Sequence, residues 1–228
     1  MYNKDYYENI LFTNYKFTKE RRNIFRFYIH LIREKKKDIK CLLDIGCAWG
    51  YFINVCEDEK ISEIYGIDIS CEALNEAKKY TSAKIYNIDI SKEKSIFTDN
   101  YFDVITAIDV VEHIENDRVF LKEVYRILKK DGLFFIITPN PKSILRKIYL
   151  KIKRKDEDPT HINLQPVEYW QNLLKEIGFK KIEIKGCLIH GFPPFTELRD
   201  KLKGFFLIKP LLLPFKVGER FYIFARKL

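Results

Sequence analysis

The sequence predicts a doubly wound α/β fold, in which helices cover both faces of a mostly parallel sheet. Five short and almost continuously apolar segments lie between residues 41 and 139, and amphipathic segments with helical spacing alternate with them. Strands that are buried on both faces are typically unbroken apolar runs, and a strand–helix–strand order implies right-handed crossovers between parallel strands. The alternation therefore favours one sheet in a single domain spanning residues 1–228.

The first predicted element is a helix at Glu20–Ile32, within a helical N-terminal segment of residues 1–40. Its apolar residues recur at the spacing of one helix face. They are Ile24, Phe25, Phe27, Tyr28, Leu31 and Ile32. A polar run from Arg33 to Lys40 follows, so we expect this helix to pack on the sheet through its apolar face.

The remaining elements follow in order along the chain. The predicted strands are Cys41–Gly46, Glu63–Asp68, Ala83–Asp89, Phe102–Asp109 and Gly132–Pro139, followed by two late strands, Lys180–Leu188 and Arg220–Ala225. The predicted helices between them are Cys71–Tyr80, Asp117–Lys130 and Pro166–Ile177. Proline in a first turn and glycine just after a last turn are the usual boundaries of helices.

Two insertions interrupt the alternation. Residues 140–163 form a predicted basic lid, because seven Lys and Arg and no acid lie between positions 142 and 155, beside an apolar helical stripe. Residues 190–219 form an insertion before the last strand, and within it residues 204–215 are apolar but are interrupted by Lys209, Pro210 and Pro214. A charged run of this kind is commonly a solvated helix face, yet it also suits an anionic surface.

Composition narrows the class of protein. The 228 residues carry 41 Lys and Arg against 32 Asp and Glu, a net charge of +9, which suits an anionic partner. Five cysteines without a CxxC motif argue against a disulfide scaffold and a zinc ribbon. No secretory signal or membrane-spanning run is visible, so we expect a cytoplasmic protein.

The segment Leu42–Phe52, LLDIGCAWGYF, indicates a ligand site where the first strand turns into a helix. Gly46 and Gly50 allow a sharp turn and close approach of a ligand. The spacing is neither the GxGxxG of dinucleotide sites nor the GxxxxGK[ST] of phosphate loops. Asp68 ends the second strand, where a carboxylate can accept hydrogen bonds from a ribose diol, and Asp89 ends the third.

These motifs together resemble the class I S-adenosylmethionine-dependent methyltransferases. FDVITAIDVVEHI, DGLFFIITPN and the Gly178–Phe179 pair followed by two late strands extend the resemblance over nearly the whole chain. It implies a Rossmann-like seven-stranded sheet with Arg220–Ala225 as its antiparallel strand. It also implies cofactor-binding residues: Asp44, Gly46, Cys47, Ala48, Trp49, Gly50, Tyr51, Asp68, Ile69, Asp89, Ile90 and Asp109. Ala48 departs from the family, which more often has glycine there.

Two of the aromatic residues in this set have a second interpretation. Trp49 and Tyr51 could approach the sulfonium through cation–π attraction, although packing is the commoner role of such rings. Cys47 is interpreted as a small turn residue and not as a nucleophile, because no base partner is evident.

A second constellation follows the fourth strand. Asp109, Glu112 and His113 lie at the carboxyl edge of the sheet, and His161 ends the basic lid. This set resembles the E-x-x-E-H motif and distant histidine of metal-dependent O-methyltransferases, with Asp109 in place of the first glutamate. One interpretation is a Mg²⁺ or Mn²⁺ site formed by all four residues. The alternatives are acid–base catalysis by His113 with Glu112 and His161, or a purely structural role.

The sequence leaves the methyl acceptor open. Oxygen methylation of a small molecule, sugar or lipid-linked acceptor is the leading hypothesis, with peripheral membrane contact through residues 142–155 and 204–215. The alternatives are an RNA methyltransferase, an NAD-dependent oxidoreductase on the same architecture, and a non-catalytic S-adenosylmethionine-binding module. Nucleic acid is the less favoured partner, because no RNA-binding module accompanies the core.

Overall fold

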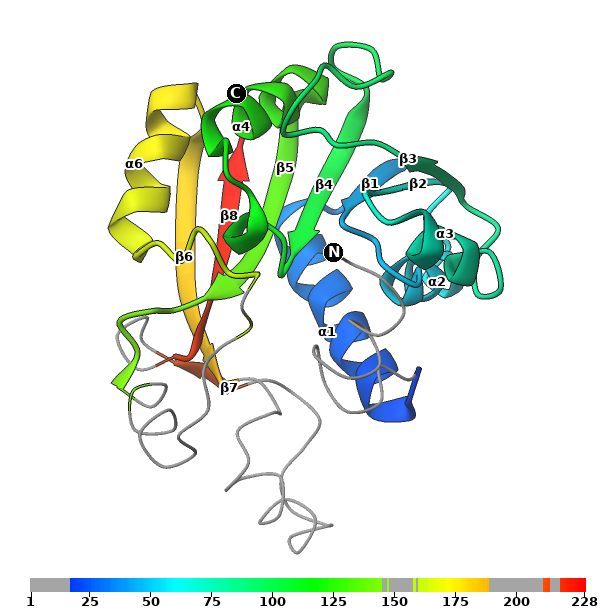
Figure 1. Cartoon of the computed structure of the whole chain (residues 1–228), viewed down its shortest axis with the longest axis horizontal. Helices are drawn as coiled ribbons and strands as arrows, with labels where there is room; N and C mark the ends of the chain where they lie inside the picture. Colours follow the sequence, from blue (N-terminus) through cyan, green and yellow to red (C-terminus); the bar gives the residue numbers. More distant parts are fainter. Residues whose placement is uncertain (1–16, 145–146, 148–157, 159, 189–210, 214–217) are drawn as a thin grey trace, which may run out of the picture.

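The sheet has eight strands in the order β3-β2-β1-β4-β5-β8-β6-β7 (Figure 1). The computed structural model describes residues 17–144, 147, 158, 160–188, 211–213 and 218–228. Most of the two predicted insertions, including residues 148–157 and 189–210, lies outside these described residues. In the part of the chain that is described, no helix is long and apolar enough to cross a membrane.

Five parallel strands form the first part of the sheet, as the apolar runs predict. They are β1 (Cys41–Ile45), β2 (Glu63–Asp68), β3 (Lys84–Asn87), β4 (Phe102–Ile108) and β5 (Leu128–Pro139). β8 (Arg220–Arg226) runs antiparallel between β5 and β6 (Lys180–Leu188), which confirms the expected antiparallel strand. The sheet gains a short edge strand, β7 (Leu211–Leu213), paired with β6 inside the second insertion.

Helices pack on both faces of this sheet, which confirms the doubly wound architecture. Among the described residues the helices are α1 (Lys19–Lys35), α2 (Tyr51–Asp58), α3 (Cys71–Ala77), α4 (Asp117–Ile127) and α6 (Val167–Ile177), and η2 (Val111–His113) is a 3-10 turn. α1 and α2 cover one face, whereas α4 and α6 cover the other. α1 begins after Thr18, whose hydroxyl accepts the amide proton of Arg21 at 3.3 Å, as a helix cap should.

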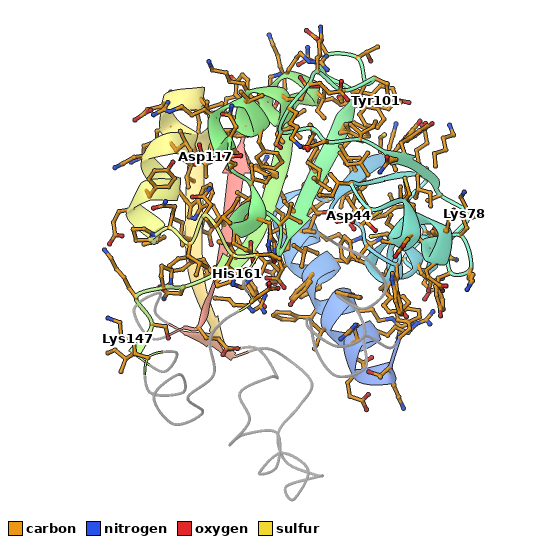
Figure 2. The ribbon with its side chains drawn as sticks, viewed as in Figure 1. Asp44, Lys78, Tyr101, Asp117, Lys147 and His161 are labelled. Atoms are coloured by element: carbon orange, nitrogen blue, oxygen red, sulfur yellow. The ribbon has the colours of Figure 1, made fainter. Side chains whose placement is uncertain are left out.

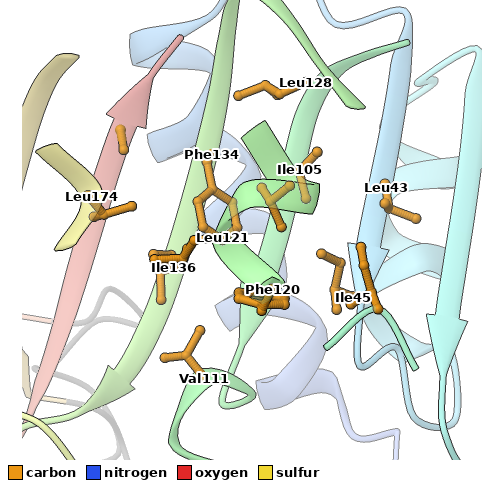
Figure 3. Close-up of a cluster of buried hydrophobic side chains, with 14 of the residues drawn as sticks. Leu43, Ile45, Ile105, Val111, Phe120, Leu121, Leu128, Phe134, Ile136 and Leu174 are labelled. Carbon is orange, nitrogen blue, oxygen red and sulfur yellow. The ribbon is translucent and has the colours of Figure 1, made fainter. Parts of the chain in front are cut away.

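Each central strand contributes alternate residues to two apolar cores. Leu43, Ile105 and Phe134 face α4, where they pack with Phe120 and Leu121 (Figure 3). Their neighbours in sequence, Leu42, Val104 and Phe135, face the opposite core beneath α1 and α2. All of these side chains are almost fully buried. Because successive side chains of a strand point to opposite faces, alternate residues pack into the two different cores.

The boundary between α4 and β5 differs from the sequence expectation. The predicted helix Asp117–Lys130 ends at Ile127, because Leu128 already pairs with Phe102 of β4. The ammonium group of Lys227 then binds the carbonyl oxygens of Tyr125 at 2.6 Å and Leu128 at 2.8 Å, and so satisfies acceptors at the end of the helix. The predicted helix Cys71–Tyr80 likewise ends earlier, at Ala77.

Candidate functional site

The turn between β1 and α2 is built from residues with positive φ. Gly46 has φ of +69°, Ala48 of +48° and Gly50 of +73°, so three of five consecutive residues adopt left-handed backbone conformations. A Cβ on Gly46 would lie 2.4 Å from Cγ2 of Val110, so both space and conformation require glycine there. The predicted glycine turn is therefore present, and Ala48 occupies a conformation that disfavours a side chain.

Asp68, at the end of β2, stabilises this turn through hydrogen bonds. Its two carboxylate oxygens accept the amide protons of Ala48 at 2.9 Å and of Ser70 at 2.8 Å. Burial raises the pKa of Asp68. Each oxygen of an ionised carboxylate has a further lone pair, so these bonds are compatible with the expected contact to a ribose diol.

Asp44 lies beside this turn within the sheet. Its side chain is 3% exposed, and the hydroxyl of Thr106 donates a hydrogen bond of 2.6 Å to its Oδ1. Burial raises the pKa of Asp44 to about 7. Burial also raises the pKa of the Cys47 thiol well above its usual range, which disfavours a thiolate nucleophile and agrees with a small turn residue.

Trp49 and Tyr51 belong to an aromatic cluster. Tyr51 stacks on Phe17 with ring centroids 4.6 Å apart, and Trp49 meets Tyr51 edge to face at 6.0 Å. Both rings are buried, at 8% and 2% exposure. These contacts show the packing role of both rings, and their contact with the sulfonium stays a prediction.

Asp89 begins a loop at the far side of the same sheet edge. Its Oδ1 accepts hydrogen bonds from the amide and hydroxyl of Ser91, at 3.1 Å and 2.6 Å, and Lys92 lies 2.9 Å from its Oδ2. Although partial burial acts in the opposite direction, these bonds lower the pKa of Asp89. Ile69 is 51% exposed, whereas Ile90 is buried at 3%.

An open depression of about 440 Å³ lies next to the Asp89 loop. It is lined by Ser91, Lys92, Glu115 and Asn116. Because Ser91 and Lys92 both contact the Asp89 carboxylate, the depression continues the sheet edge on which Asp89 lies. Carboxyl ends of parallel strands are the usual ligand sites of this architecture.

Asp109, which follows β4, is held away from the histidines that were expected to share a metal with it. Its φ is +56°, its amide donates to the carbonyl of Ile137, and its carboxylate forms an ion pair with Arg220 of β8. The four-residue metal interpretation is therefore not what the geometry supports, because a guanidinium neutralises the Asp109 carboxylate.

The other three candidates do gather. Donor atoms of Glu112, His113 and His161 all lie within 4.8 Å of one another, and the two imidazole rings are 4.9 Å apart. Figure 2 shows His161 near the arrowheads of β4 and β5, at the carboxyl edge of the sheet. Glu112 is fully buried, and the Thr138 hydroxyl donates to its Oε2 at 3.1 Å. One carboxylate and two imidazoles form a donor set that suits a divalent cation.

Hydrogen bonds bring His161, distant in sequence, to this position. The amide of Asn163 donates to the carbonyl of Glu112 at 2.9 Å, and the Asn163 side chain donates to the carbonyl of Ile114 at 3.0 Å. His113 Nδ1 lies 3.0 Å from the carbonyl oxygen of Thr160. Burial lowers the pKa of His113, which favours the neutral imidazole that a base or a metal ligand requires.

Sequence reasoning missed several supporting residues. Thr106 and Thr138 interrupt buried apolar strands, and a polar residue in such a strand signals a buried hydrogen-bond partner. Thr160 and Asn163 lie at the end of the predicted lid, after its basic residues, and gave no comparable signal. Arg220 opens the last strand, and nothing local in the sequence connects it with Asp109, which lies 111 positions earlier.

Comparison with known proteins places this geometry in context. A family model described as "Methyltransferase domain" matches residues 17–184. A ubiquinone biosynthesis O-methyltransferase from Glaesserella parasuis is 32% identical over 173 residues, which cover 69% of this chain and 71% of that protein. An enzyme of the same name from Pelagibacter ubique is 35% identical over 107 residues, but the alignment covers only 46% of this chain and 43% of that protein.

Solved structures share the architecture. A SAM-dependent methyltransferase from Archaeoglobus fulgidus superposes with a TM-score of 0.65 at 23% identity, covering 90% of this chain and 94% of the other. At that identity the likeness concerns the fold, and it agrees with the order and direction of the strands described above.

Proposed function

The chain belongs to the methyltransferase domain family, as an S-adenosylmethionine-dependent methyltransferase, and from this premise we propose that it methylates a hydroxyl oxygen of a small or lipid-linked acceptor. The observation that carries the proposal is the cluster of Glu112, His113 and His161 at the carboxyl edge of β4. A hydroxyl is a weak nucleophile until its proton is lost, and these side chains are of the kinds that assist that loss.

The donor occupies the glycine turn in this proposal. The Gly46–Gly50 backbone supplies room for its amino-acid end, Asp68 binds its ribose, and the loop at Asp89 accommodates its adenine. Ile69, next to Asp68, is 51% exposed, so its side chain is available to pack on the flat adenine base. Asp44, below the turn, contributes a polar group whose charge varies near neutral pH.

Methyl transfer is an in-line displacement. The acceptor oxygen forms the new bond to carbon, the carbon–sulfur bond breaks, and its electron pair stays on sulfur in S-adenosylhomocysteine. The protein aligns the two reactants and excludes water. The hydroxyl proton leaves the acceptor, and the Nε2 atom of His113 is the candidate to receive it.

A divalent cation fits the same cluster. Glu112, His113 and His161 would hold it, and Asp109 would not, because Asp109 pairs with Arg220. When bound, such a cation would lower the pKa of an acceptor hydroxyl. Two imidazoles among three donors favour Mn²⁺ over Mg²⁺, which prefers an all-oxygen shell.

The proposal is tested by incubating the full chain with S-adenosylmethionine and a panel of phenols, sugars and lipid-linked alcohols. The expected result is S-adenosylhomocysteine together with an acceptor one methyl group heavier, measured by mass spectrometry. His113→Ala should lower the turnover rate, whereas the matched variant His30→Ala, on the exposed side of α1, should not. Tight donor binding without any methylated acceptor would instead support the non-catalytic module.

An RNA acceptor and a membrane location are separate outcomes of the same assay. RNA that receives the methyl group, with binding that weakens steeply as salt rises, would favour the RNA methyltransferase. We propose that residues 142–155 and 204–215 form a peripheral membrane contact of a cytoplasmic enzyme. Sedimentation of the protein with anionic vesicles tests this contact. Loss of binding in neutral vesicles would support the electrostatic contact.

A further inference from the structure

The orientation of His113 depends on two residues of the segment that carries His161. His113 Nδ1 lies 3.0 Å from the carbonyl oxygen of Thr160 and also 3.0 Å from the hydroxyl oxygen of Thr160. A carbonyl oxygen can only accept, so the contact with it requires a proton on Nδ1. The ring proton of neutral His113 is therefore on Nδ1, and Nε2 carries a lone pair.

Asp158 settles the direction of the second contact. The Thr160 hydroxyl lies 2.6 Å from Oδ1 of Asp158, and an ionised carboxylate can only accept, so the hydroxyl donates to Asp158. The Thr160 hydroxyl proton therefore points toward Asp158 and not toward His113. The hydroxyl oxygen can then accept a hydrogen bond from Nδ1–H of His113. The Thr160 amide also donates to Asp158 Oδ1, at 2.9 Å, which fixes the position of the loop.

We propose that Asp158 and Thr160 are positioning residues for His113. Because Asp158 accepts the hydrogen bond of the Thr160 hydroxyl, both the hydroxyl oxygen and the carbonyl oxygen of Thr160 can accept from His113 Nδ1–H. These two contacts keep the ring proton on Nδ1 and leave the Nε2 lone pair toward the methyl acceptor. The catalytic meaning of this arrangement rests on the proposed function, but the tautomer itself does not. The lone pair serves equally to receive a proton or to bind a cation, because second partners of this kind orient histidines in both cases.

Charged and titratable groups on the neighbouring elements agree with this orientation. Glu112 precedes His113 in η2 and His161 follows Thr160, and donor atoms of the three residues lie within 4.8 Å of one another, so the His113 ring lies beside both groups. Burial of His113 disfavours its charged form, which would place protons on both nitrogens. The neutral ring therefore has one lone pair to present.

The test is the tautomer of His113 in the full chain, measured by two-bond nitrogen–proton correlation on protein labelled at histidine nitrogen. The chain has four histidines, and His113→Gln assigns the signal. At slightly alkaline pH the wild-type protein should show Nδ1 as the protonated nitrogen. A wild-type spectrum with the proton on Nε2 would overturn the proposal without any reference to activity.

Substitutions test the role of Asp158. Asp158→Ala frees the Thr160 hydroxyl to donate to Nδ1, so a signal from the Nε2–H form should appear and kcat should fall about tenfold or more. Asp158→Asn keeps an oxygen that accepts the hydroxyl proton, and should keep the wild-type tautomer. Adding Thr160→Val to Asp158→Ala removes the competing donor and should restore Nδ1–H.

These outcomes separate the inference from the proposed function. An unchanged tautomer in Asp158→Ala, or the same spectrum in the single and double variants, would overturn the role of Asp158. Wild-type Nδ1–H with no methyl transfer to any hydroxyl acceptor would refute the proposed function alone. A general loss of folding in Asp158→Ala would appear in all histidine signals, and in that case the Asp158→Asn and wild-type spectra decide the question.

Discussion

The carboxylate of Asp109 and the guanidinium of Arg220 form an ion pair that joins the end of β4 to the start of β8. The two strands are not neighbours, since β5 lies between them in the sheet. The pair therefore holds the carboxyl edge together across β5, and it removes Asp109 from the Glu112, His113 and His161 cluster.

A double-mutant cycle measures this ion pair. Asp109→Asn and Arg220→Met should each lower the free energy of unfolding, with a coupling energy of about 1 kcal/mol, between the values for exposed and buried pairs. The Asp109 side chain is 36% exposed, and solvent screening limits the energy accordingly. Chemical denaturation of the four proteins provides the measurement, and additive effects would mean that the pair contributes no stability.

Asp68→Ala should weaken binding of S-adenosylhomocysteine about tenfold or more, because hydrogen bonds to a carboxylate are worth about 1.5–3 kcal/mol. It also removes the acceptor of the Ala48 and Ser70 amides. Titration calorimetry measures the affinity.

Asp103 provides a matched control for Asp68. It too accepts two backbone amide protons, from Lys40 at 3.0 Å and Cys41 at 2.9 Å, but it lies at the amino end of β4, away from the site. Asp103→Ala should lower stability without changing the affinity. Equal losses of affinity in both variants would refute the ribose assignment.

Ala48→Gly should stabilise the protein. The left-handed conformation of Ala48, with φ of +48°, costs about 1–2 kcal/mol, whereas the added chain entropy of glycine costs about 0.5–1 kcal/mol. The net gain of about 0.5–1 kcal/mol corresponds to roughly 2 °C in Tm for a chain of this size. Lys60→Gly, at φ of +59° after α2, should give a similar gain. A lower Tm for Ala48→Gly would show that its methyl group contributes packing.

Asp44→Asn should stabilise the protein increasingly as pH rises from about 4 to about 7. The folded-state pKa of about 7 lies above the usual value near 4, so over this range the folded state binds more protons than the unfolded state. Stability contributed by Asp44 therefore falls as pH rises, and the amide variant escapes this loss while keeping an acceptor for Thr106. Denaturation at several pH values measures the difference, which should be smallest near pH 4; a constant difference would contradict the raised pKa.

Removal of divalent cations tests the metal interpretation. Prolonged chelation should abolish methyl transfer, and Mn²⁺ should restore it better than Mg²⁺. Glu112→Gln should raise the Mn²⁺ concentration needed for half-maximal activity, whereas Asp109→Asn should leave it unchanged. Full activity in the presence of chelator would instead leave His113 as the base.

The sequence predicted every strand except the short edge strand β7, because most of these strands are almost continuously apolar segments bounded by turn residues. It also predicted the glycine turn, Asp68, Glu112 and His113, because these residues belong to motifs at strand ends. His161 was joined to them by the family resemblance, and the predicted set wrongly included Asp109. The sequence could not predict the Asp109–Arg220 pair or the Thr160–His113 contact, since both depend on how distant segments meet. The predicted end of α4 was wrong for a related reason. The helix ends where Leu128 pairs with β4 and where the side chain of Lys227 binds the last carbonyl oxygens, and both contacts come from distant segments.

The position of β8 has a consequence for how the domain assembles. Arg220–Arg226 lies inside the sheet, hydrogen-bonded to β5 on one side and to β6 on the other. During synthesis, β6 can pair with β7 but cannot join the rest of the sheet until β8 has left the ribosome. Until then the apolar side chains of β6 stay outside the core of the domain. Such late, long-range closure is slow and exposes the nascent protein to aggregation, so expression at low temperature or with chaperones should raise its soluble yield.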